Sequence, residues 1–142
     1  MTHVSESIDV AVGADRVFPL FTDLETLPRM LSFIRSVEQL DAERTRWVVA
    51  IAGQERTFNV RLVEHEPGRR LVWERDAASA QPFRIQALTE PLGPESTRVT
   101  IDAEFDAGGM AEKLGLAKAL ASKGLRDELK NSKLYVERRY AG

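Results

Sequence analysis

The beginning of the fold is encoded in residues 5–12, SESIDVAV, which run directly into residues 13–31, GADRVFPLFTDLETLPRML. The first stretch alternates polar and apolar residues, as a strand with one covered face does. The second spaces its apolar residues three and four apart, which is typical of helices. We expect Asp15 to be an N-cap, Pro19 to distort the first helix, and Pro28 to lie near the first position of a second. One strand followed by two short helices is therefore predicted.

Six further stretches are predicted to be strands, separated by turn residues; five alternate in the same way, and residues 34–40 do so less regularly. Clean alternation and hairpin-length turns indicate antiparallel pairing with one covered face and one wet face. The pattern places Trp47, Phe58, Trp73, Ile85 and Ile101 on the covered face, and Arg61, Arg84, Arg98 and Asp102 in solvent. The predicted strands are 34–40, 46–52, 56–64, 70–75, 82–89 and 97–105.

A long helix is predicted from about residue 110 to about residue 140, where proline is absent and helix-forming residues dominate. Its apolar stripe, interrupted by Ser132, consists of Met110, Leu114, Ala117, Ala121, Leu125, Leu129 and Val136. This is the only long element available to cover the apolar face of the sheet. The sequence therefore predicts one α+β domain, residues 1–142, in which a curved seven-stranded antiparallel sheet wraps around a C-terminal helix.

Small residues in the middle of this helix, Gly115 and Gly124 among them, would lie opposite large aromatic residues of the sheet. Two readings remain open: close helix–sheet packing, or a cavity for an apolar ligand. If a cavity exists, we expect its entrance near residues 27–33, because short helices open more readily than sheets. The residues expected to line it are Leu27, Met30, Leu31, Phe33, Trp47, Phe58, Trp73, Phe83, Leu114, Ala117 and Ala121.

Composition and motifs exclude several classes of protein. The chain has no cysteine and a net charge of −2, so cysteine-based zinc sites are excluded and nucleic acid is not an expected partner. No sequence such as GxSxG, HExxH or a Walker motif occurs. His3 is expected in an N-terminal tail and His65 in a solvated turn rather than in a metal site. We therefore predict no catalytic residue, metal or cofactor, no stable membrane insertion, a cytoplasmic location, and a monomer or homodimer.

Three phrases resemble one known family: SESIDVAVGADRVFPLFTDLETLP, VEQLDAERTRWVVAIAGQERTFNVRLVEHEPGRRLVWER and STRVTIDAEF. They are similar to the polyketide cyclase/dehydrase family of the START-like (SRPBCC) superfamily, near the coenzyme Q-binding proteins. The resemblance implies the helix-grip fold, with two short helices between the first two strands. It also implies a central cavity, in which members of the superfamily bind lipids, quinones, polyketides or plant hormones. The matching features specify the fold, so they indicate function only weakly.

Three functions are compatible with these patterns. The protein is a binder or carrier of a hydrophobic or amphipathic small molecule, a cyclase or aromatase that uses the same cavity, or an interaction domain whose cavity is vestigial. A cyclase would need polar groups that point inward to polarise a carbonyl. An interaction domain would need a continuous core and an exposed apolar patch. The side chains predicted to point inward from the strands are almost all apolar, which favours binding over catalysis.

Overall fold

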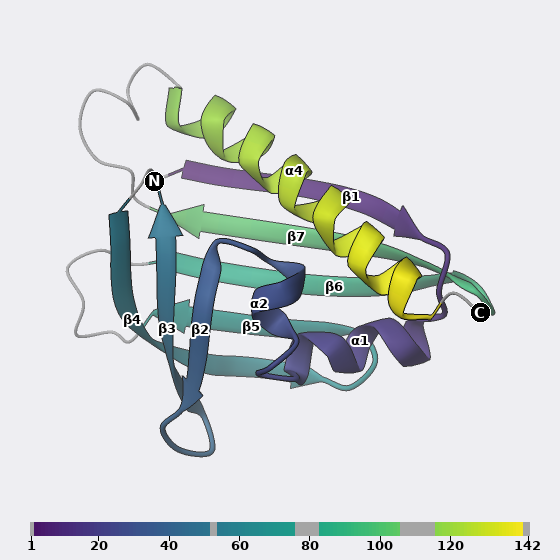
Figure 1. Cartoon of the computed structure of the whole chain (residues 1–142), viewed down its shortest axis with the longest axis horizontal. Helices are drawn as coiled ribbons and strands as arrows, with labels where there is room; N and C mark the ends of the chain where they lie inside the picture. The colour runs from purple at the N-terminus through teal and green to yellow at the C-terminus, as the bar shows by residue number, and fades with distance from the viewer. Residues whose placement is uncertain (1, 52–53, 76–82, 106–115, 141–142) are drawn as a thin grey trace.

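The elements follow one another in the predicted order of one strand, two short helices, six strands and a long C-terminal helix (Figure 1). The computed structural model describes residues 2–51, 54–75, 83–105 and 116–140. The elements are β1 (Thr2–Val10), α1 (Ala14–Thr22), α2 (Leu27–Met30), β2 (Ile34–Gln39), β3 (Arg44–Ile51), β4 (Gln54–Glu66), β5 (Arg70–Arg75), β6 (Phe83–Gly93), β7 (Ser96–Phe105) and α4 (Leu116–Arg139).

The strands form one seven-stranded sheet in the order β1-β7-β6-β5-β4-β3-β2, and every neighbouring pair is antiparallel. The first strand therefore pairs with the last, as in Val4 opposite Ala103. The pairing register shifts between Leu62 and Glu64 in the long strand β4. Such bulges bend a strand and increase its twist. In Figure 1 β2 and β3 run steeply while β1, β7 and β6 lie almost horizontally, so the sheet curves strongly.

The helices lie against the sheet at different places. In the described residues α4 packs along β1 and against α2, α1 packs against β6 and β7, and α2 packs against β2 (Figure 1). The buried face of α4 includes Leu129, Ser132 and Val136, at the three- and four-residue spacing that the sequence predicts. The predicted seven-stranded sheet with its long helix is thus confirmed. Residues 110–115 of the predicted helix lie outside the described residues.

Two predicted boundaries are wrong. Strand β1 begins at Thr2, so His3 lies in the sheet rather than in a tail, with its Nε2 2.8 Å from Asp102 Oδ1 on β7. The few residues before Ser5 are too short a stretch for alternation to distinguish an N-terminal tail from the start of an edge strand. The strand predicted for residues 82–89 continues to Gly93, which leaves only Pro94 and Glu95 between β6 and β7. Residue 52, the last of the predicted strand 46–52, lies outside the described residues.

The start of α1 also differs from the expectation. Gly13, not Asp15, is the N-cap, and no side chain caps this end of the helix. A glycine is needed there because a Cβ at Gly13 would stand 2.6 Å from the carbonyl oxygen of Pro94. The helix nevertheless continues through Pro19. Pro28 lies in the first turn of α2, as predicted.

The predicted faces of the sheet are largely confirmed. Trp47, Trp73 and Ile101 are buried, while Phe58 and Ile85 are half-buried and pack against the same core. On the other face Arg61 and Arg98 are exposed. Arg84 and Asp102 differ from the expectation in being half-buried, because neighbouring outer-face side chains cover them. Arg84 Nε lies 3.6 Å from Glu74, and Asp102 lies between His3 and Gln86.

Candidate functional site

A cluster of four aromatic side chains covers the concave face of the sheet. Trp47 on β3 and Trp73 on β5 meet edge to face with ring centroids 5.8 Å apart. Phe83 on β6 lies 6.5 Å from Trp47 and 5.6 Å from Phe58. These arrangements are the ones that aromatic pairs prefer. All four were predicted from alternation, and the curvature of the sheet brings them together although they come from four strands.

A cavity of about 110 Å³ lies beside the two tryptophans. It is bounded by α1, by the start of α2, by the turn between β2 and β3, and by β3, β4 and β5. No described residue of α4 lines it. Of the predicted lining residues, it brings together Leu27, Trp47 and Trp73. The other lining residues are Phe21, Thr22, Leu24, Gln39, Ala42, Glu43, Thr45, Leu62, His65 and Leu71.

Several polar groups of this cavity already have partners within the chain. Trp47 Nε1 donates to Thr45 Oγ1 at 2.8 Å. The amide of Gln39 donates to the backbone carbonyls of Asp41 and Arg44. The hydroxyl of Thr22 donates to the carbonyl of Pro19 at 2.8 Å. These groups shape the rim of the cavity and hold the turns around it, which suits binding of an apolar molecule better than proton transfer.

His65 has a place that the sequence did not reveal. It lies in β4 before the turn, lines the cavity, and stacks on Phe18 of α1 with ring centroids 5.9 Å apart and 24° between the planes. Strict alternation would put Leu62 and His65 on opposite faces, because they are three positions apart. The register shift between Leu62 and Glu64 brings both to the cavity. His65 is exposed, as predicted, but it lies at the end of β4 rather than in a turn. A bulge of this kind leaves no clear mark in a single sequence, so the sequence did not place His65 beside the cavity.

The remaining predicted lining residues occupy other positions. Met30 and Leu31 are buried in the core, and Phe33 is half-buried against it. Ala121 is half-buried on α4. Leu114 and the side chain of Ala117 lie outside the described residues. Gly124 is exposed, with open space where a Cβ would stand, so it does not contribute volume between helix and sheet.

The described residues contain neither a metal-binding cluster nor a membrane-spanning helix. Within the described residues no group of three or more histidine, aspartate or glutamate side chains is placed to hold a metal ion. The same part of the chain contains no helix long and apolar enough to cross a membrane. The buried polar side chains in it are hydroxyls, namely Thr2, Thr26, Thr89, Thr97 and Ser132.

Known proteins share both the sequence pattern and the fold. A family model described as polyketide cyclase/dehydrase and lipid transport matches residues 1–137. An uncharacterised 17.2 kDa protein of Streptomyces lincolnensis is 25% identical over 139 residues, which cover 98% of this chain and 92% of that protein.

Two solved structures illustrate the similarity in fold. A START superfamily protein from Mycobacterium smegmatis has a TM-score of 0.82 at 21% identity, over 97% of this chain and 99% of that one. An aromatase/cyclase from a Streptomyces species has a TM-score of 0.79 at 20% identity, over 96% and 94% of the two chains. At these identities both structures bear on the fold alone.

Proposed function

Because the chain belongs to the polyketide cyclase/dehydrase and lipid transport family, we propose that it binds a hydrophobic or amphipathic small molecule inside the curved sheet. The observation that supports this most is the cavity beside Trp47 and Trp73, to whose wall α2 contributes Leu27. Flat aromatic walls and a polar rim suit a ligand with a ring and a polar end, such as a quinone or a polyketide-like molecule.

The cavity must widen to accept such a ligand. Its volume is about 110 Å³, whereas pockets for small molecules measure about 300–1,000 Å³. The element best placed to move is α2, because it has only four residues and contributes Leu27 to the wall. We therefore expect the wall at Leu27 to shift when a ligand enters.

The interior could also take a ligand further along α4, beside Ala121. Two substitutions distinguish between these two possible positions of the ligand. Leu62→Trp adds a ring to the described cavity, and Ala121→Phe adds a ring at the half-buried face of α4. Leu92→Trp is the matched control, because Leu92 is 46% exposed and does not line the cavity.

The experiment measures fluorescence of the neutral dye Nile red with the parent protein and the three variants. Loss of dye binding in Leu62→Trp, with binding kept in Leu92→Trp, supports the cavity beside the tryptophans. Loss in Ala121→Phe alone moves the ligand to α4. If the parent protein takes up no dye, and protein purified from its own host carries no lipid or quinone in native mass spectrometry, the proposal fails.

A cyclase activity in the same cavity is the alternative. It needs a free polar group that points at the substrate. Thr22, Gln39 and Trp47 are engaged in hydrogen bonds with the chain. The ionisable lining side chains, Glu43 and His65, are exposed to solvent, and His65 stacks on Phe18. We therefore favour binding over catalysis as the proposed function.

A further inference from the structure

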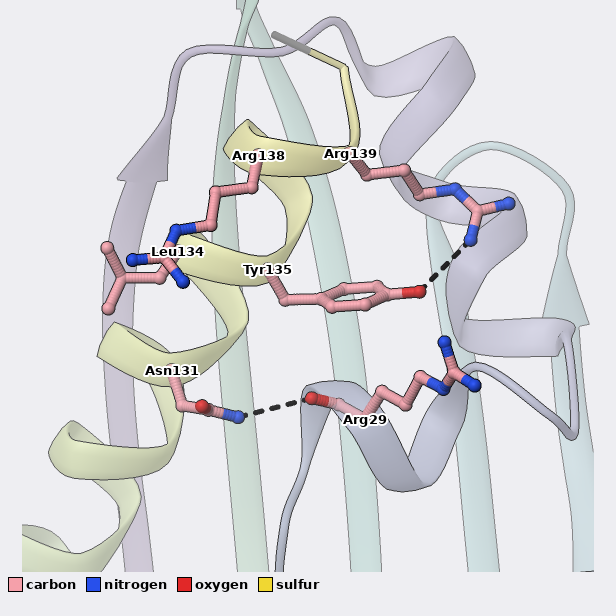
Figure 2. A pocket seen from close by; sticks show the side chains of 6 residues that line it. All are labelled: Arg29, Asn131, Leu134, Tyr135, Arg138 and Arg139. Atoms are coloured by element: carbon pink, nitrogen blue, oxygen red, sulfur yellow. Dashed lines mark hydrogen bonds between the residues drawn. The ribbon is translucent and has the colours of Figure 1, made fainter.

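A second hollow lies on the outer surface, between α2 and the last turns of α4 (Figure 2). Its volume is about 520 Å³. The six residues that line it are Arg29, Asn131, Leu134, Tyr135, Arg138 and Arg139. Three of the six are arginines that come from two separate elements. In Figure 2 Arg138 extends to the side of α4 where Leu134 lies, whereas Arg29 and Arg139 share the other side. Like charges on one side of a groove repel one another, so the arrangement favours an anion.

The geometry points to a defined position for that anion. In Figure 2 the guanidinium groups of Arg29 and Arg139 lie on the same side of the groove, with the hydroxyl of Tyr135 between them. Arg139 Nη1 donates to Tyr135 Oη at 3.0 Å, and its guanidinium lies 5.9 Å from the ring centroid of Tyr140. Asn131 donates to the carbonyl of Arg29 at 3.2 Å, which holds α2 against α4. These contacts fix Tyr135, Arg139 and the backbone at Arg29 before a ligand arrives, which lowers the entropic cost of binding.

The glutamates of α4 do not neutralise these arginines. Glu128 accepts hydrogen bonds from the backbone N–H and the hydroxyl of Ser32, both at 2.6 Å. Glu137 accepts from Lys133 at 2.6 Å and from the backbone N–H of Ala11 at 2.9 Å. Among the described residues no ion pair joins Arg29 or Arg138 to a carboxylate.

Asp23 is a carboxylate whose pKa is affected by Arg139 of the groove. Its pKa is held below its usual range mainly by the backbone N–H of Glu25 and the hydroxyl of Thr26, and only in small part by Arg139. The N–H of Glu25 lies 3.0 Å from Asp23 Oδ1. Asp23 is therefore engaged in the turn between α1 and α2, and among the described residues no ion pair joins it to Arg29 or Arg139.

We propose that Arg29, Tyr135 and Arg139 bind the phosphate group of a small molecule or of a lipid head group. Two guanidinium groups and a hydroxyl supply several donors around one point, which matches the oxygens of a phosphate better than one planar carboxylate. Leu134, 53% exposed in the wall of the groove, offers an apolar contact to the part of the ligand beyond the phosphate. This site is separate from the interior cavity, because Leu27 of α2 lines the cavity while Arg29 lines the groove.

The test uses the full chain and two sources of phosphate. In the first arm, ¹⁵N-labelled protein is titrated with inorganic phosphate at constant ionic strength, with acetate as the comparison anion. In the second arm, flotation measures binding to phosphatidylcholine vesicles with and without phosphatidylglycerol. The variants are Arg29→Gln with Arg139→Gln, and Tyr135→Phe, which removes a donor without changing charge. Arg126→Gln is the matched control, because Arg126 lies on α4, is exposed, and pairs with Glu6 outside the groove.

The double variant should weaken binding by about tenfold or more in whichever arm the parent binds, and Tyr135→Phe by a smaller factor. Arg126→Gln should change it less than about twofold, because that charge is outside the groove. Saturable binding of inorganic phosphate identifies a free phosphate compound as the ligand class, and binding to phosphatidylglycerol vesicles alone identifies a lipid head group. The proposal is overturned if neither arm shows binding, if acetate binds as well as phosphate, or if Arg126→Gln loses as much as the double variant.

Discussion

The hydroxyl of Ser132 on α4 lies 2.6 Å from the backbone carbonyl oxygen of Met30 on α2, although the two residues are 102 positions apart. Both residues are buried. Ser132 is the polar residue that interrupts the apolar stripe of α4, and this bond is the reason that a polar residue is tolerated there. The bond holds α2, which contributes Leu27 to the wall of the cavity, against α4.

Replacing Ser132 by alanine should therefore lower the free energy of unfolding by about 1 kcal/mol. The loss of stability should not be larger, because Asn131 also donates to the carbonyl of Met30, at 3.2 Å, and this bond remains in the variant. Amide exchange should accelerate selectively at the N–H of Leu31, which bonds to the carbonyl of Leu27 in α2. Urea unfolding and hydrogen exchange measure the two effects, and Ser36→Ala on the exposed face of β2 is the control. An unchanged exchange rate at Leu31 would contradict the role of this bond.

Trp47 should behave as a packed core residue. It is 1% exposed and contacts both Trp73 and Phe83. Trp47→Ala should lower the free energy of unfolding by about 3–5 kcal/mol, and Trp47→Phe should cost less, because most of the packing remains while the bond to Thr45 is lost. Denaturant titration of both variants measures this order. A loss below about 1 kcal/mol for Trp47→Ala would indicate that the aromatic cluster is loosely packed.

Gly124→Ala should stabilise the protein. Gly124 lies inside α4, is exposed, and has no atom within 4 Å of the position of an added Cβ. Glycine inside a helix costs about 0.5–1 kcal/mol relative to alanine, so the free energy of unfolding should rise by that amount. Gly13→Ala is the opposing control, because its Cβ would meet Pro94 and it should destabilise. A lower melting temperature for Gly124→Ala would show that residue 124 packs closely against another element.

Acid should weaken the contact between α4 and β1. The hydrogen bond from Lys133 and then the backbone N–H of Ala11 hold the pKa of Glu137 below its ordinary value of 4.5. A carboxyl group with a lowered native pKa stabilises the fold above its unfolded pKa, and this stabilisation is lost as the pH falls through the native pKa. The free energy of unfolding should therefore fall as the pH drops below about 4.5.

Glu137→Gln removes this titration. The variant should be less stable than the parent at neutral pH, and its stability should change less between about pH 5 and pH 3. Urea unfolding at a series of pH values measures the difference, with Glu95→Gln in the exposed turn between β6 and β7 as the control. Parallel pH profiles for the parent and Glu137→Gln would rule out this contribution of Glu137.

Much of the fold was readable from the sequence because its signals are local. Alternation identified the strands, Pro28 marked the start of α2, and Leu129 and Val136 marked the buried face of α4. These patterns reflect which face of an element avoids water, and that preference acts on each element separately. The errors lie at the ends of elements, where few residues carry a signal, as at His3 and Gly93.

The candidate sites depend on contacts between distant residues. The sequence by itself determined that Trp47 and Trp73 face inward, but only the curvature of the sheet and the bulge before Glu64 brought His65 to the same cavity. It also showed arginines near the end of α4 without indicating that Arg29 of α2 lies beside them. Periodicity determines the face of a residue within its own element, whereas the pairing of α2 with α4 arises from tertiary hydrogen bonds such as that between Ser132 and Met30. Such pairs join parts of the chain whose local patterns are independent, so only the folded structure determines them.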